Sequence, residues 1–401
     1  MKKYVKVLVS VLTTMAVATA LVGCGSTTGA SGSKKTGQTI TVWSHLDGPE
    51  IPELRKQCEA WAKKTGNKVK VVKDSNDFNK LVVVAKSPKA PDLMIGISHD
   101  NTGAFVKAGI LDEVPSGTIN DSDYLSDDVV NSGKCEGKQY GVPFFTETYA
   151  LFYNKDKVKN PPATWDDLIT QAKQVGFEYD LTNFYYSYAF IASTGGYVFK
   201  NNNGTLDVNK IGLGDEAVPG LKMINDLIKD GFMKASITGD IAKGDFQSKK
   251  TGFYISGPWD VDPLKKAGVN FGIERIPQIG GKDSKTFMGV QVGLVLKNSK
   301  NKSLDWDLMK YLQQDDNLTA LGKVGNRLPA KKSIKVTDDY SKAFLDQAKT
   351  AEPMPNVPQT SAIWDPAKNA LQLIATGKST PEAAAKAMYD SVTKGIKTMA
   401  N

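Results

Sequence analysis

The stretch TITVWSHLDGPEIPELRKQCEAWAKKTGNKVKVV, residues 39–72, contains a strand pattern, a helix pattern and a second strand pattern in succession. Its first five residues are mostly β-branched, which favours a strand, and the apolar residues from Ile51 to Trp61 recur with the period of a helix. Gly66 ends that helix, and residues 69–72 form the second strand. Because strands that alternate with helices build a parallel sheet covered on both faces, the stretch predicts an α/β fold.

The alternation continues further along the chain. Residues 78–85 have a helical pattern and residues 92–97 a strand pattern. Thr164 begins a later helix with a spacing that resembles a capping box. Thr380 precedes the last helix, which has Pro381 at its first position, where proline is favoured. The length of the chain suggests two domains of ordinary size.

The chain begins with an export signal. Three lysines occur among the first six residues, and residues 7–22 are apolar or small throughout, which is the pattern of a signal peptide. Residues 21–24, LVGC, resemble the lipobox of bacterial lipoproteins, which implies cleavage before Cys24 and a lipid on its sulfur. An ordinary secretory signal with a chance cysteine is the alternative. We predict that residues 1–23 are a lipoprotein signal peptide.

A Ser/Gly/Thr-rich segment follows, residues 24–38, with the composition of a flexible tether. No other segment approaches the roughly 20 apolar residues of a membrane-spanning helix. A lipidated cysteine on such a tether would hold the rest of the protein in water at the extracellular face of the bacterial cell membrane.

The charge pattern argues against a nucleic-acid partner. The chain has 51 Lys and Arg against 43 Asp and Glu, a formal net charge of +8, and the signal peptide carries three of the lysines. The remaining lysines are scattered among acidic residues, whereas nucleic-acid binders concentrate them in a patch or stripe. Only Arg55, Arg275 and Arg327 are arginines.

Two cysteines remain besides Cys24. Outside the cell, Cys58 and Cys135 could form a disulfide. Cys58 also lies on the apolar helical stripe, so a buried free thiol is an alternative. The sequence leaves both possibilities open.

Motifs for catalysis or cofactor binding are missing from the sequence. There are only two histidines, His45 and His99, and no His-Glu-x-x-His, Cys-x-x-Cys or Gly-x-Ser-x-Gly. Residues 212–217 have spaced glycines but follow a polar stretch instead of a strand, so we expect a turn. Residues 377–379 resemble the end of a phosphate-binding loop, but Gln372 replaces the required glycine. We therefore expect no enzyme, cofactor or metal, although 43 acids cannot exclude a glycosidase by counting.

From about Thr39 to the C-terminus, the sequence resembles the maltose/maltodextrin-binding proteins of bacterial ABC importers. The motifs that carry the resemblance, in their order along the chain, are 42–47 (VWSHLD), 90–94 (APDLM), 99–100 (HD), 140–143 (YGVP), 151–156 (LFYNKD), 161–165 (PPATW), 195–200 (GGYVFK), 257–259 (GPW), 354–359 (MPNVPQ) and Trp364. The segment 354–364 is the most specific of them.

The resemblance implies a two-lobed α/β fold, the type II periplasmic-binding-protein fold, in which each lobe is a sheet flanked by helices. A sugar would lie in the cleft between the lobes. The implied first lobe is 39–145 with 293–333, the second is 150–287 with 340–401, and three hinge crossings fall near 145–150, 287–293 and 333–340.

The resemblance also implies the sugar-binding residues. Trp259, Trp364 and Tyr185 match stacking aromatics, which take the apolar faces of sugar rings. Asp47, Asp100 and Glu147 match carboxylates that bind sugar hydroxyls by charge-assisted hydrogen bonds. The last two follow predicted strand ends, where α/β folds place ligands. Trp43, Trp61, Trp165 and Trp306 are expected to pack in the core.

Several family positions are changed in this chain. Gly48 replaces a lysine and Ile97 a tryptophan platform. The remaining replacements keep a polar residue at the implied site: Asn101 for an arginine, Asn183 for a glutamate, Asp365 for a tyrosine and Lys368 for an arginine. Phe184, Tyr186 and Tyr188 add aromatic surface near Tyr185. The preferred length or linkage of the sugar is therefore expected to differ from that of maltose.

The function implied is that of a monomeric, lipid-anchored receptor that delivers a maltodextrin-like oligosaccharide to ABC permease subunits. The nearest alternative is a receptor of the same fold for a galacto- or xylo-oligosaccharide. A surface-anchored glycan-cleaving enzyme and an adhesion or structural lipoprotein are alternatives of other classes.

Overall fold

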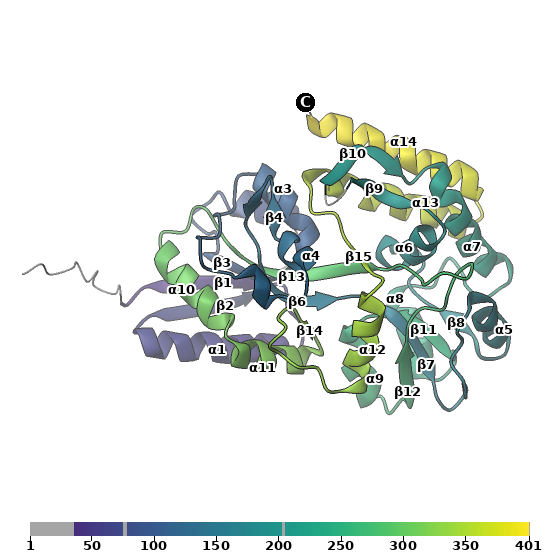
Figure 1. Ribbon diagram of the computed structural model, residues 1–401, viewed down its shortest axis with the longest axis horizontal. Helices are drawn as coiled ribbons and strands as arrows, with labels where there is room; N and C mark the ends of the chain where they lie inside the picture. The colour runs from purple at the N-terminus through teal and green to yellow at the C-terminus, as the bar shows by residue number, and fades with distance from the viewer. Residues whose placement is uncertain (1–35, 75–77, 203–204, 401) are drawn as a thin grey trace, which may run out of the picture. The chain divides into compact units, whose positions relative to one another are not determined.

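The computed structural model describes residues 36–74, 78–202 and 205–400 (Figure 1). The expected signal peptide, the lipidation site Cys24 and most of the expected tether lie outside the described residues.

The first of two large sheets has the strand order β14-β6-β13-β3-β1-β2, with β15 also paired to β13. Its strands are β1 (Thr39–Ser44), β2 (Lys68–Lys73), β3 (Leu93–Ser98), β6 (Val142–Glu147), β13 (Phe287–Val295), β14 (Leu328–Pro329) and β15 (Glu352–Pro353). β1 runs parallel to β2 and β3, as the sequence predicted. β13 is antiparallel to both β3 and β6, so the sheet as a whole is mixed and the parallel pairing of the first three strands does not extend to it. The reason is that β13 enters this sheet from the second one, against the direction of its neighbours.

Helices cover both faces of this sheet, and together they form what we call the first lobe. The elements are α1 (Glu50–Thr65), α2 (Phe78–Val84), η1 (His99–Asn101), α3 (Thr102–Lys107), η2 (Asp121–Asp123), α4 (Asp127–Asn131), the hairpin β4 (Lys134–Cys135) and β5 (Lys138–Gln139), α10 (Lys302–Leu312) and α11 (Asp315–Gly325). The apolar stripe of α1 packs with α10 and α11 on one face. Phe105 of α3 and Tyr124 lie in the core of the other face.

The second lobe is built on a sheet of order β12-β7-β11-β8. Its elements are β7 (Ala150–Asn154), α5 (Trp165–Val175), β8 (Phe177–Glu178), α6 (Phe184–Ser193), the hairpin β9 (Tyr197–Asn202) and β10 (Thr205–Gly212), η3 (Asp215–Ala217), α7 (Val218–Lys229), α8 (Gly239–Gln247), β11 (Phe253–Ser256), η4 (Pro258–Asp260), α9 (Val261–Lys266), β12 (Phe271–Glu274), α12 (Asp339–Ala348), η5 (Pro358–Ala362), α13 (Trp364–Ala375) and α14 (Pro381–Ala400).

Two predicted helix starts are confirmed, and one strand was not predicted. The Thr164 hydroxyl accepts from the Asp167 N–H at 3.2 Å and donates to its carboxylate at 2.7 Å, so the predicted cap is confirmed. The last helix begins at Pro381 as predicted. The polar stretch before Gly212 is strand β10, which the sequence analysis missed. It pairs antiparallel with β9, so the glycines still lack the βαβ context of a dinucleotide site.

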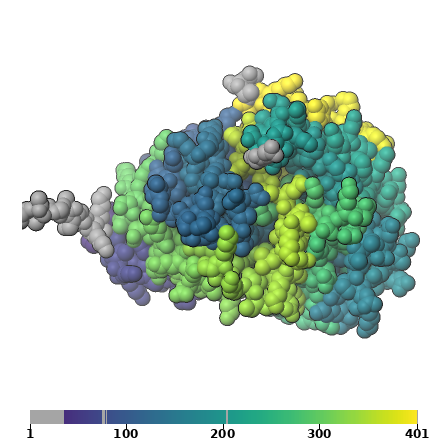
Figure 2. Space-filling view, viewed as in Figure 1, coloured from purple at the N-terminus to yellow at the C-terminus, as the bar shows by residue number. Residues whose placement is uncertain are grey.

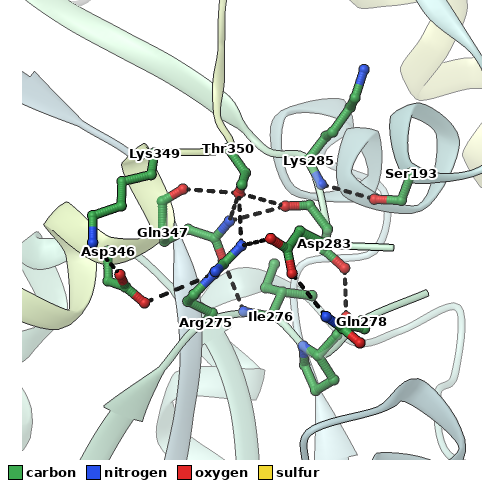
Figure 3. Close-up of polar contacts among 12 residues, drawn as sticks. Ser193, Arg275, Ile276, Gln278, Asp283, Lys285, Asp346, Gln347, Lys349 and Thr350 are labelled. Carbon is green, nitrogen blue, oxygen red and sulfur yellow. Dashed lines mark hydrogen bonds and ion pairs between the residues drawn. The ribbon is translucent and has the colours of Figure 1, made fainter. Parts of the chain in front are cut away.

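The chain passes from one lobe to the other at residues 148–149, 275–286 and 330–338, and it contacts the first lobe again after α12. The first two segments are joined by a hydrogen bond of 2.7 Å between the Thr148 and Thr286 hydroxyls. Figure 3 shows the second segment bound to the end of α12. The Thr148 hydroxyl donates to the Phe287 carbonyl at 2.8 Å. The buried Gln347 amide, at the end of α12, accepts from the Ile276 N–H at 2.8 Å and donates to the Ser284 carbonyl at 3.2 Å.

The chain after α12 returns to the first lobe. β15 pairs with β13, and the Asn356 amide donates to three carbonyls of the segment 131–134. In Figure 2 the yellow-green segment that includes α12 lies between the blue part of the first lobe and the teal second lobe. Residues 352–358, expected in the second lobe, therefore contact the first.

The four tryptophans assigned to core packing are all in apolar surroundings. Trp61 and Trp306 are buried in the first lobe, and their indole N–H groups donate to Asp307 and Asp112. Trp165 packs edge-on against Phe177 and Phe190 of the second lobe, and Trp43 packs against the first-lobe core.

Both described cysteines, Cys58 and Cys135, are buried and free, so the structure favours the free-thiol alternative. Burial raises the pKa of the Cys58 thiol to about 12 and also raises that of Cys135. Because the thiolate is the reactive form, we expect neither thiol to react with iodoacetamide in native protein that starts at Ser26. Unfolding without reductant should expose two reactive thiols by mass spectrometry; failure to label them after unfolding would indicate a disulfide.

Candidate ligand-binding site

Three carboxylates lie at one edge of the first sheet. Glu147 is the last residue of β6, and Asp100 lies in η1 directly after β3. These strands both run antiparallel to β13, which lies between them, so their carboxyl ends meet at the same edge. Asp47 follows β1 at that edge, is 77% exposed and pairs with Lys73 at 2.7 Å. The predicted placement of Asp100 and Glu147 at strand ends is confirmed.

Hydrogen bonds hold the two half-buried carboxylates. Asp100 accepts from the Ser98 hydroxyl at 2.6 Å and from the Asn101 amide at 3.2 Å. Glu147 accepts from Arg327 Nη1 at 2.8 Å and from the Gln291 amide at 3.0 Å, both at Oε2. Asn101, one of the predicted site residues, therefore lies beside Asp100.

The two carboxylates interact electrostatically. Burial raises the pKa of Asp100 to about 6; the Ser98 hydroxyl opposes this shift and the negative charge of Glu147 adds to it. Burial also raises the pKa of Glu147, against the attraction of Arg327. His45 favours the charged form of both carboxylates. A polar ligand that donates hydrogen bonds at this edge would meet acceptors that are partly withdrawn from water.

An aromatic row faces this edge: Trp259, Tyr185, Phe287 and Trp364. The ring centres of Trp259 and Tyr185 lie 6.4 Å apart, those of Tyr185 and Phe287 6.2 Å, and those of Phe287 and Trp364 6.2 Å. Trp259 and Trp364 are both half-buried. Trp259 lies directly over Gly257, where a Cβ atom would come within 2.2 Å of the indole. The glycine of the Gly-Pro-Trp motif thus makes room for the tryptophan.

Tyr185 connects the aromatic row to the carboxylates. Its ring belongs to the row, and the charges of Glu147 and Asp100 act on its hydroxyl. That hydroxyl is buried and has no hydrogen-bond partner among the residues that the structure describes. Since an unpaired buried hydroxyl is unfavourable, this atom is suited to a polar group of a ligand.

The other predicted site residues lie on the second lobe. Asn183 caps α6 by accepting from the Tyr185 N–H at 3.1 Å, and it is also hydrogen-bonded to Asp180. Lys368 and Asp365 are exposed on α13, and the positive charge of Lys368 favours the ionised form of Asp180. Both Asn183 and Lys368 thus act on Asp180, a residue that no sequence motif indicated.

The sequence analysis also missed His45 and Arg327. The His45 ring stacks on Phe78 with centres 5.3 Å apart, and its Nδ1 lies 3.2 Å from Asp74. His45 directly follows the end of β1, so its position after a strand could have identified it. The only sequence feature that distinguished Arg327 is that the chain has just three arginines.

Residues 36–74, 78–202 and 205–400 contain no group of three His, Cys, Asp or Glu side chains that could hold a metal ion. Within the same residues, no helix is both long and apolar enough to cross a membrane.

Carboxylates on one lobe and an aromatic row at the lobe connections define a class of protein: a receptor that binds a small polar solute having apolar faces. The chain belongs to the bacterial extracellular solute-binding protein family, whose model matches residues 56–346. It is thus the sugar-binding, non-catalytic component of an ABC importer, which excludes the glycan-cleaving alternative.

The chain is similar to proteins that are named for two different kinds of oligosaccharide. The galactooligosaccharide-binding protein of Bacillus subtilis (strain 168) is 31% identical, with 92% of each chain covered. A maltooligosaccharide ABC transporter solute-binding lipoprotein of Streptococcus pneumoniae (strain ATCC BAA-255 / R6) is 30% identical, with 94% of each covered. The solved maltose-maltodextrin binding protein of Alicyclobacillus acidocaldarius is 38% identical with a TM-score of 0.85, over 88% of this chain and 100% of that one. The predicted periplasmic-binding-protein fold is confirmed.

Proposed function

We propose that this protein binds a maltodextrin-like oligosaccharide between its lobes and delivers it to the permease subunits of the importer. The observation that carries the proposal is Tyr185, whose ring joins the aromatic row while its buried, unpaired hydroxyl is acted on by the charges of Asp100 and Glu147. A sugar ring needs this combination, because its faces are apolar and its rim consists of hydroxyls.

In the proposed complex, sugar rings stack on Trp259, Tyr185 and Trp364. Asp47, Asp100 and Glu147 accept hydrogen bonds from the hydroxyls, and Asn101, Asn183, Asp365 and Lys368 contribute further polar contacts. Such a ligand would touch both lobes at once.

The lobes are proposed to divide at 39–145 with 293–333 and at 150–287 with 340–401, and to close around the sugar by a hinge motion. A ligand that contacts both lobes favours the closed form by its higher affinity for it. Small-angle X-ray scattering should therefore show a smaller radius of gyration at saturating sugar. An unchanged radius at saturation would argue against the hinge.

A galacto-oligosaccharide is the second candidate ligand. The similarity to the Bacillus subtilis galactooligosaccharide-binding protein supports it, as do Gly48, Ile97, Asn101 and Asp365 at changed positions of the maltodextrin pattern. Titration of the same preparation with maltotriose, galactotriose and xylotriose would decide between the candidates. Exclusive binding of galactotriose would keep the transport role and replace the maltodextrin assignment.

Sugar affinity should depend on pH through Asp100. The ionised carboxylate accepts stronger hydrogen bonds than the neutral acid, and its pKa is raised to about 6. The affinity is expected to be constant above about pH 7.5 and to fall as the pH drops through about 6. Asp100→Asn should bind more weakly at pH 8 and lose this dependence. Equal wild-type affinity at pH 8 and pH 5 would contradict the role of Asp100.

We also propose that the protein is a monomer anchored by a lipid on Cys24 at the extracellular face of the membrane, with residues 24–38 as the tether. The name of the Streptococcus pneumoniae relative, a lipoprotein, supports this location. Cys24→Ser should release the protein from membranes into the soluble fraction. Retention of the variant in washed membranes would indicate another anchor.

A further inference from the structure

Arg327 is buried between two glutamates of the first lobe. Its side chain is 7% exposed. Its Nε and Nη2 donate to the two oxygens of Glu50 at 2.9 and 3.0 Å, and its Nη1 donates to Glu147 Oε2 at 2.8 Å. The fork of the guanidinium is thus paired at both ends with carboxylates, a geometry that fixes orientation as well as charge.

Glu50 extends this contact to Asp47. Glu50 is the first residue of α1, and its Oε2 accepts from the Asp47 N–H at 3.1 Å. In return, the Glu50 N–H donates to the Asp47 carbonyl at 3.0 Å. Arg327 therefore reaches the backbone of Asp47 through a single side chain.

Two glycines leave little room for these carboxylates to move. A Cβ atom at Gly325 would lie 2.3 Å from Glu50 Oε1, and one at Gly289 would lie 2.8 Å from Glu147 Cγ. Gln291 adds its bond to Glu147 at Oε2, the oxygen that Arg327 also uses. Within the described part of the chain, Glu147 Oε1 accepts no hydrogen bond and is available to a ligand.

We infer that Arg327 is a positioning residue for ligand binding, which holds Glu147 directly and Asp47 through Glu50 so that both carboxylates face one ligand. The inference rests on the proposed function for the identity of the ligand, a neutral sugar. Lysine cannot reproduce the arrangement, because a single ammonium group lacks the planar fork that meets both glutamates.

The first test measures the titration midpoint of the Glu147 carboxyl group in the absence of sugar. The charged and titratable groups that act on Glu147 are Arg327, Glu50, His45, Asp100 and Tyr185. Carboxyl ¹³C NMR, with the Glu147 signal assigned by its loss in Glu147→Gln, should show a higher titration midpoint in Arg327→Met, since the stabilising cation is removed. An unchanged midpoint would overturn the inference.

The matched control is Arg275→Met. Arg275 also forms an ion pair, with Asp283 at 3.0 Å. It lies in the connecting segment 275–286, whose contacts Figure 3 shows. This variant should leave the Glu147 midpoint unchanged and the affinity for maltotriose within about twofold of wild type. An equal shift in both variants would mean that the effect is general destabilisation.

The second test measures sugar binding in Arg327→Lys, which keeps the charge and is the safer variant to fold. We expect at least about a tenfold loss of affinity for maltotriose at pH 7.5, the equivalent of one charge-assisted hydrogen bond. Thermal melting would confirm that the variant is folded. Wild-type affinity in Arg327→Lys would overturn the inference, whereas a wild-type protein that binds no glycan would instead refute the proposed function.

Discussion

Replacement of Trp364 by alanine is expected to weaken oligosaccharide binding by about 30-fold or more. Truncation of a central tryptophan commonly costs about 2 kcal/mol or more in an interface. Trp364 is half-buried at the start of α13. Its ring centre lies 6.0 Å from that of Phe184 and 6.2 Å from that of Phe287, so the ring is held in place before a ligand binds. Isothermal titration with the preferred trisaccharide would measure the loss.

Leu373→Ala is the matched control for Trp364. Leu373 lies on the same helix and is 37% exposed, but it is not part of the aromatic row. Its truncation should leave affinity unchanged. Trp259→Ala should weaken binding like Trp364→Ala, because it removes the other end of the row. Affinities within twofold of wild type in both tryptophan variants would exclude the aromatic row as the sugar platform.

The second large effect is expected from His99→Leu, which should destabilise the free protein by about 2–6 kcal/mol. His99 is fully buried; its Nε2 lies 2.9 Å from the Met354 carbonyl, and its Nδ1 accepts from the Val290 N–H at 3.0 Å. Leucine would leave that carbonyl and that N–H unpaired, at about 1–3 kcal/mol each. Met354 lies just after β15, so His99 ties the returning segment to the first lobe.

Urea unfolding would measure the change, with His99→Gln as the conservative control. The glutamine amide can both donate and accept, so it should recover part of the stability. Loss of less than about 0.5 kcal/mol in His99→Leu would show that the two backbone groups find other partners.

Two neighbouring groups, His99 and Asp100, make opposite contributions to the pH dependence of stability. Burial lowers the pKa of His99 from 6.5 to about 4, so the stability it contributes is lost as the pH falls through that window. Burial raises the pKa of Asp100 from 3.8 to about 6, so the folded state retains this proton and stability rises as the pH falls from about 6 to 4. His99→Gln and Asp100→Asn would separate the two contributions.

Local patterns predicted the first part of the fold well. The strands at β1, β2 and β3 and the helix α1 lie within two residues of their expected bounds. The antiparallel direction of β13 could not be predicted, because the period of a buried strand does not reveal its direction or partners. Strand β10 was missed because its exposed residues are polar.

The candidate site also contains residues that the sequence indicated and residues that it did not. Asp100, Glu147 and the two tryptophans of the row were selected because they match the family's motifs, and the predicted strand ends supported the choice of the two carboxylates. Arg327 was not selected, because its contact with Glu50 joins residues 277 positions apart and leaves no local sequence pattern. Asp180 was not selected either, although Asn183 and Lys368 both favour its ionised form.

The most direct test of the account is a calorimetric titration of the protein from Ser26 onward with maltotriose, galactotriose and xylotriose. The account predicts one site per chain with a micromolar or tighter dissociation constant for maltotriose. Binding of galactotriose alone would change the sugar and keep the receptor. Absence of binding by all three would contradict the proposal that the aromatic row and the carboxylates form an oligosaccharide site.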